Sequence, residues 1–133
     1  MLDSGDFNFS FSGLKTSLIY KTKKEKELLK KENMEDLVAS FQKAIVDVLV
    51  KKTIKACKKY NCKTLLISGG VSANSQLRKN FDVKCKKESI DLHVPPLWLC
   101  MDNAAMVACL GYYKFISGKT SKLDAEVYSK SDF

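Results

Sequence analysis

A short apolar stretch, Leu65–Ile67, is followed by Ser68, a double glycine and then a helical pattern. Residues without Cβ let the backbone pass close to a ligand, and the next helix offers free N–H groups at its start. Gly69 and Gly70 therefore indicate an α/β fold with a nucleotide site at a strand-to-helix turn. For the double glycine alone, a plain tight turn with Ser72 as the helix N-cap is the better interpretation, because no P-loop or G-x-G-x-x-G pattern is present.

The residues around this turn predict a βαβ unit. Residues 64–68 have the continuous apolar character of a strand buried in a parallel sheet, residues 73–87 a helical pattern, and residues 91–94 a second strand. Two strands joined by a helix are expected to be parallel, with a right-handed crossover.

Helices are predicted on both sides of this unit. Apolar residues at helical spacing predict the longest helix at about residues 34–60, with Asn33 as N-cap and its apolar face in the core. Alternating phenylalanines at residues 7–11 predict a strand that ends at Gly13. The Lys/Glu run at residues 20–31 is either a solvated helix face or a mobile connection.

Composition limits the protein class. The chain has 133 residues, 45% of them hydrophobic, which predicts one domain over residues 1–133. No long apolar window or signal-peptide pattern is present, so we expect no membrane or secretory targeting. Five cysteines without a C-x-x-C pair indicate a reduced, cytosolic and mostly structural set, with Cys57 and Cys109 on apolar helix faces; reactivity is conceivable only for Cys62 and Cys100.

The chain is basic, with a formal net charge of +8. Nearly all of the positive charge comes from lysine, and Arg78 is the single arginine. Scarcity of arginine argues against base-specific readout, whereas lysines can still attract a phosphate backbone. A solvated surface explains the same charge, so tRNA or another polyanion is an open possibility.

Asp102 opens the last predicted helix, which runs to about Ser117 and ends at Gly118. Its carboxylate is either a simple N-cap or a metal ligand at the C-terminal edge of the sheet, and both roles are compatible. The single histidine, His93, lies mid-strand, so this chain has no histidine-rich metal site of its own.

Five short stretches, in order and at characteristic intervals, resemble the C-terminal part of the TsaD/Gcp family, formerly named O-sialoglycoprotein endopeptidases. The stretches are residues 9–16, 39–42, 68–74 with Leu77-Arg78, Pro95-Pro96, and 102–106. The resemblance covers nearly the whole chain but only the C-terminal part of a full-length member. Its Gly-Gly-Val-Ser-Ala-Asn sequence is that of bacterial or organellar members. A natural short product, a split gene and a piece cut from a longer, two-domain enzyme are all open, and Met1 directly before family-like sequence favours the last.

The resemblance implies a tRNA N6-adenosine threonylcarbamoyltransferase, which moves threonylcarbamoyl from its adenylate to adenosine 37 of ANN-decoding tRNA. It implies the C-terminal half of an actin-like, sugar-kinase-like ATPase (ASKHA) fold, with a βαβ core and long flanking helices. The implied partners are tRNA and, in bacteria, TsaB- and TsaE-like proteins. The implied location is the cytoplasm, or the mitochondrion for an organellar member.

The resemblance also implies site residues. Asn74 matches the substrate-binding asparagine, with the Gly69-Gly70 backbone against the nucleoside, and Asp102 matches a ligand of one divalent metal, iron or zinc. Lys15 and residues 10–13 are candidates for shaping the cleft. The H-x-x-x-H ligands of the N-terminal half are absent from this chain. No catalytic residue is therefore assigned, and the chain alone is expected to be inactive.

Other functions remain open from the sequence. One is a non-catalytic module that binds nucleotide or docks a partner. Another is a different carbamoyltransferase or kinase of the same fold. The metallopeptidase activity of the older family name is disfavoured, because no H-E-x-x-H sequence is present.

Overall fold

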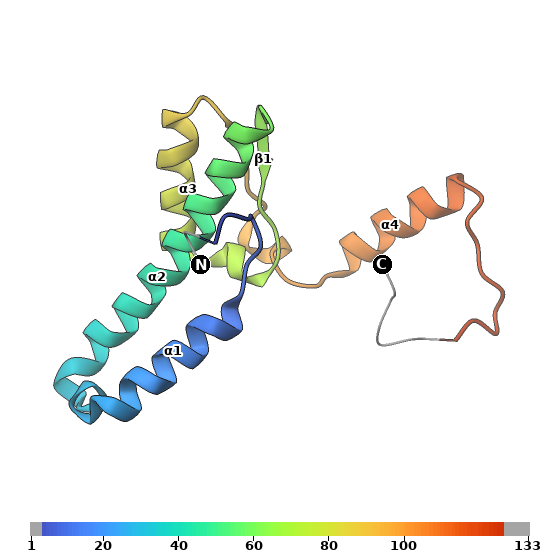
Figure 1. Cartoon of the computed structure of the whole chain (residues 1–133). Helices are drawn as coiled ribbons and strands as arrows, with labels where there is room; N and C mark the ends of the chain where they lie inside the picture. Colours follow the sequence, from blue (N-terminus) through green and yellow to red (C-terminus); the bar gives the residue numbers. More distant parts are fainter. Residues whose placement is uncertain (1–3, 127–133) are drawn as a thin grey trace. The chain divides into compact units, whose positions relative to one another are not determined.

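The computed structural model describes residues 4–126 and divides the chain into two compact units, residues 1–100 and 101–133 (Figure 1). Each unit is described by itself. Along the chain the elements are α1 (Phe11–Lys24), η1 (Lys26–Leu29), α2 (Lys31–Lys59), β1 (Thr64–Leu66), η2 (Gly70–Ala73), α3 (Ser75–Lys87), β2 (Asp91–His93), η3 (Leu97–Leu99) and α4 (Ala104–Ile116).

The predicted βαβ unit is confirmed. Strands β1 and β2 pair in parallel, with Leu65 opposite Leu92, and α3 connects them. The expectation of a fully buried strand is wrong for Leu66, which is 75% exposed. Side chains alternate between the two faces of a strand. Leu65 and Leu92 therefore pack against the core, whereas Leu66 faces the other side.

The core of the first unit lies between the C-terminal half of α2, α3 and the two strands (Figure 1). Its buried members are Val46, Val50, Ile54, Cys57, Leu77, Phe81, Cys85 and Ile90. The predicted apolar face of α2 is therefore core only in its second half. Val38, in the first half, is 59% exposed, because neither α3 nor the strands extend along that part of the helix.

The start of α2 differs from the prediction. The helix begins at Lys31, so Asn33 lies in its first turn rather than at the N-cap. The Asn33 side chain instead donates from Nδ2 to the carbonyl of Glu27 in η1, at 2.9 Å. Of the two alternatives for the Lys/Glu run at residues 20–31, the structure shows the exposed helix. The run forms the end of α1, then η1 and the first residue of α2.

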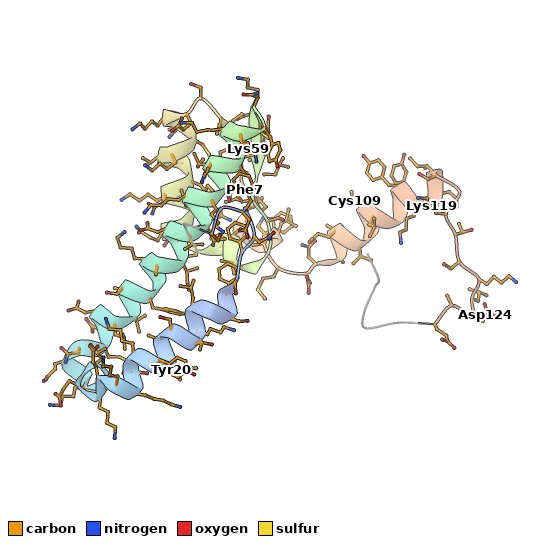
Figure 2. All side chains as sticks on the ribbon, in the orientation of Figure 1. Phe7, Tyr20, Lys59, Cys109, Lys119 and Asp124 are labelled. Carbon is orange, nitrogen blue, oxygen red and sulfur yellow. The ribbon has the colours of Figure 1, made fainter. Side chains whose placement is uncertain are left out.

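The predicted strand at residues 7–11 is wrong. Residues 7–10 form no ladder and α1 begins at Phe11. An alternating segment becomes a strand only with a partner, and within residues 4–126 the only strands, β1 and β2, pair with each other. Phe7 instead packs against Tyr60 at the end of α2, with the Lys59 ammonium 5.3 Å from the Phe7 ring centroid (Figure 2).

A buried lysine fixes this N-terminal segment to α2. Lys52 is only 3% exposed, and its Nζ donates to Ser4 Oγ at 2.8 Å, Asp6 Oδ1 at 3.1 Å and the Asn8 carbonyl at 2.7 Å. Buried ammonium groups require such partners. The Ser4 hydroxyl and Lys52 both donate to Asp6, and they hold the pKa of that carboxyl below its ordinary value of 3.8.

The second unit contains α4, whose apolar side chains are exposed (Figure 2). Cys109 is exposed as well, so the expectation that it packs on an apolar face is wrong for this unit as described. Gly118, with φ +70°, ends the helix as predicted, in the left-handed conformation that favours glycine. Among residues 4–126 no helix is both long and apolar enough to cross a membrane.

Candidate functional site

The glycine turn after β1 has one residue with an unusual backbone. Gly69 has φ +85° and ψ 165°, a combination that is essentially restricted to glycine. Gly70 begins η2, and its backbone has no positive φ. Of the two glycines, it is therefore Gly69 whose backbone conformation requires glycine. Gly70 continues the turn in a conformation open to other residues.

Asn74 is the N-cap of α3, in place of the predicted Ser72. Its Oδ1 accepts a hydrogen bond from the Leu77 amide at 2.9 Å, which satisfies one of the free donors of the first turn. Ser72 is buried, and its hydroxyl has no hydrogen-bond partner within residues 4–126. The turn thus places the Asn74 carboxamide at the head of α3 in a fixed orientation.

Arg78 holds this turn in place. Its Nε donates to the Ser72 carbonyl at 2.6 Å, and its Nη2 to the Pro95 carbonyl at 2.8 Å and to Cys100 Sγ at 3.0 Å. The rigid fork of a guanidinium is suited to joining several acceptors. The single arginine of the chain therefore links the glycine turn to the segment after β2, rather than facing a ligand.

A pocket of about 450 Å³ lies between α1, α2 and the start of α3. Its walls are mostly apolar, with polar groups from one residue of each of these three regions, Lys15, Gln42 and Asn74. The complete lining is Phe11, Leu14, Lys15, Val38, Phe41, Gln42, Ile45, Val46, Leu49, Val71, Asn74 and Leu77. Predominantly apolar walls with a few polar groups are typical of small-molecule sites.

The structure brings some of the predicted residues to this pocket but not others. Asn74 and Lys15 line it, whereas Gly69 and Gly70 do not. Ser10 and Gly13 line a separate recess that also includes Asp6. One residue the sequence analysis did not assign, Gln42, lies beside Asn74, whose Nδ2 donates to Gln42 Oε1 at 3.0 Å. Residues 39–42 were among the matching stretches, and this was the signal that could have found it.

Asp102, in the second unit, is not the N-cap of α4. Asn103 takes that position, and its Oδ1 accepts from the Met106 amide at 3.0 Å. The cap interpretation of Asp102 is therefore wrong, and its exposed carboxylate has no partner in the described part of the chain. Residues 4–126 contain no group of three or more His, Cys, Asp or Glu that could hold a metal. Asp102 could thus contribute one ligand to a site but does not form one here.

Residues 2–109 match the family described as TsaD, tRNA N6-adenosine threonylcarbamoyltransferase. This chain belongs to the TsaD family. A Listeria welshimeri relative with that name is 49% identical over 126 residues, which are 93% of this chain and 37% of the relative. A relative of the same name from Thermosipho africanus is 48% identical over 122 residues, 91% of this chain and 36% of the relative.

This TsaD-family chain spans little more than a third of the length of these relatives. The remaining candidate residues in it are the cysteines and His93. Burial raises the pKa of the Cys57 and Cys85 thiols, which favours packing over reactivity. Cys100 is buried against Arg78, and Cys62 is exposed. His93 Nε2 lies 2.8 Å from Asp91 Oδ2 in an exposed pair.

Proposed function

We propose that this chain is the nucleotide- and substrate-binding C-terminal part of a tRNA N6-adenosine threonylcarbamoyltransferase. The complete enzyme would transfer threonylcarbamoyl from its adenylate to N6 of adenosine 37 in ANN-decoding tRNA. Family membership and the names of the relatives support this proposal. The α/β organisation, with β1, α3 and β2 between long helices, is consistent with one half of an ASKHA fold.

The pocket beside Asn74 is the observation that carries the proposal. It joins three stretches far apart in the sequence, those of Lys15, Gln42 and Asn74, around apolar walls. Such walls can hold an adenine ring, amide groups can bind its edges, and a lysine can pair with a phosphate. Among residues 4–126, Lys15 is the only cationic side chain lining the pocket, so the phosphate of the adenylate would lie toward α1.

In the proposed reaction, N6 of the tRNA adenosine attacks the carbamoyl carbon of the adenylate. The new bond is N6–C, the bond that breaks joins this carbon to a phosphate oxygen, AMP leaves, and N6 loses a proton. This chain would bind the adenosyl part of the donor through the pocket beside Asn74. No residue of the chain is assigned a proton-transfer role.

Asp102 would supply one ligand of the divalent metal, iron or zinc, with two histidines of an H-x-x-x-H sequence outside this chain. Its carboxylate fits this role because Asn103 already caps α4, and neither Asp102 oxygen has a hydrogen-bond partner among residues 4–126. A metal bound there would polarise the carbamoyl carbonyl. On its own, the chain would bind no stoichiometric metal, because a transition-metal site needs several protein ligands.

The proposed partners are tRNA, approached by the lysine-rich surface, and TsaB- and TsaE-like proteins in a bacterial source. The proposed location is the cytoplasm, or the mitochondrion for an organellar protein. Alone, the chain would act only as a nucleotide-binding module, because it spans about 37% of the length of its relatives.

The proposal is tested with a chimaera in which this chain replaces the matching 126-residue stretch of the Listeria welshimeri relative. We expect the chimaera to modify tRNA, to contain metal by elemental analysis and to bind AMP by calorimetry. The 133-residue chain alone should neither modify tRNA nor contain metal. Transfer by the isolated chain, or a folded chimaera that does not bind AMP, would contradict the proposal.

A further inference from the structure

At the pocket, Asn74 and Gln42 differ in how many of their side-chain donors and acceptors are already used in hydrogen bonds. Asn74 uses its Oδ1 to cap α3 and one Nδ2 hydrogen to bind Gln42. Gln42 uses only Oε1, and no residue within 4–126 accepts a hydrogen bond from its Nε2. An amide nitrogen carries two donors. Within the described residues, both donors of Gln42 are therefore unused, and Gln42 lines this pocket as well as a neighbouring recess.

The bond between the two amides also sets which way Gln42 faces. Only an oxygen can accept from the Nδ2 of Asn74, so Oε1 of Gln42 is turned toward Asn74. The cap fixes Asn74 in turn, because its Oδ1 must face the Leu77 amide. The contacts from α3 through Asn74 thus turn the oxygen of Gln42 toward Asn74 and leave its Nε2 as the group available to a ligand.

We infer that Gln42 is a ligand-contacting residue whose Nε2 donates to acceptor atoms of the adenosyl group, and that Asn74 acts mainly as the positioning residue that orients it. This inference rests on the proposed nucleotide function of the pocket. The adenosyl group offers ring nitrogens and ribose oxygens as acceptors, which match two free amide donors. Lys15, on the facing helix α1, is the cation available for the phosphate.

The substitution Gln42→Glu separates contact with the ligand from support of Asn74. A glutamate carboxylate still accepts from Asn74 Nδ2, so the partner of Asn74 is kept, but it has no hydrogen to donate. We expect at least tenfold weaker binding of AMP to the chimaera. Adenosine should lose affinity by a similar factor, because it carries no phosphate that the new charge could repel.

Gln76→Glu is the matched control. It makes the same chemical change on α3, in a residue that lines a neighbouring recess together with Gln42 but does not line this pocket. We expect unchanged affinity for both probes and an unchanged melting temperature. Asn74→Asp is the converse variant: aspartate keeps the cap but now accepts from Gln42, which turns the amide round. It should weaken binding without loss of thermal stability.

The outcomes distinguish the two proposals. If the unmodified chimaera binds neither AMP nor adenosine, the nucleotide function of the pocket is wrong, and the inference fails with it. If it binds both and Gln42→Glu binds them equally well, only the role of Gln42 is overturned. If AMP alone weakens, charge repulsion explains the loss and the donor role is also overturned. Loss of both ligands, with the melting temperature kept, supports the inference.

Discussion

Two helices of this chain begin with the same capping bond in different surroundings. Asn74 caps α3 at 2.9 Å and Asn103 caps α4 at 3.0 Å, each through Oδ1 to an amide three residues later. The Asn74 amide also binds Gln42 on α2, 32 residues away in sequence, whereas the second amide contact of Asn103 is local, to the Met101 carbonyl. The same local geometry becomes part of a pocket only where other elements pack around it.

The same contrast holds for apolar side chains. Phe81 on α3 is 3% exposed and lies in the core of the first unit, whereas Phe115 on α4 is 71% exposed. Burial of apolar area is the main favourable contribution to folding. The first unit thus has a core beside its pocket, whereas the second, within its described residues, presents an exposed helix and the exposed carboxylate of Asp102.

The largest difference is expected from truncating these two phenylalanines. Phe81→Ala should lower the free energy of unfolding by about 3 to 5 kcal/mol, because it leaves a cavity in the core. Phe115→Ala should change it by less than about 0.5 kcal/mol, as for other exposed positions. Urea denaturation of the 133-residue chain, followed by circular dichroism, measures both. Equal losses would show that α4 is packed as firmly as α3.

The two caps are expected to differ in ligand binding rather than in capping. Asn74→Ala and Asn103→Ala should each lower stability by about 0.5 to 2 kcal/mol, the usual loss for a cap. Asn74→Ala should also weaken AMP binding to the chimaera by about 1 to 3 kcal/mol, because it leaves pocket polar groups without partners. Calorimetry measures the affinity. Unchanged binding by Asn74→Ala would remove this residue from the site.

The two helix-flanking glycines with positive φ provide the next comparison. An added Cβ meets no atom within 4 Å at Gly69 or at Gly118, so each substitution costs backbone strain alone. Gly69→Ala should lower stability by about 1 to 3 kcal/mol, because its region is nearly exclusive to glycine. Gly118→Ala should cost about 1 kcal/mol, confined to the end of α4. Thermal melts compare them, and a neutral Gly69→Ala would contradict the turn geometry.

Asp6 provides a comparison across pH. Its pKa in the folded state is lowered by hydrogen bonds from Ser4 and Lys52, so its contribution to stability is complete above the ordinary value of 3.8 and is lost as pH falls through the folded value. Asp6→Asn should therefore be less stable than the unmodified chain at pH 7, and the difference should vanish in acid. Other carboxylates titrate in both proteins. A difference that does not depend on pH would show that the ion pair with Lys52 contributes nothing.

The smallest change in stability is expected at Asp102. Because Asn103 already caps α4, Asp102→Ala should alter stability by less than about 0.5 kcal/mol. In the chimaera the same substitution should abolish tRNA modification and reduce the metal content. Asp124→Ala, an exposed carboxylate of the same unit, is the control and should leave both unchanged. Full transfer by Asp102→Ala would show that this residue is not a metal ligand.

The sequence by itself determined the elements whose signals are local. The parallel βαβ unit, the long helix over residues 34–59 and the end of α4 at Gly118 follow from periodicity, glycine and chain direction, which neighbouring residues encode. The start of that helix at Lys31 does not. The order of the matching stretches determined the family as well. The position of the candidate site on Asn74 also came from the sequence, and its role stays a prediction.

Only the tertiary structure decided which residues share an environment. The alternation at residues 7–11 predicted a strand, but no partner strand lies beside it in the described chain, and the segment is fixed by Lys52 instead. Gln42 lies in one of the matching stretches, but its place beside Asn74 was decided only by the packing of α2. Capping likewise went to Asn74 and Asn103 rather than to Ser72 and Asp102, because the choice depends on where the backbone turns. Contacts between distant residues and the direction of a turn are properties of the folded chain, and a local pattern does not specify them.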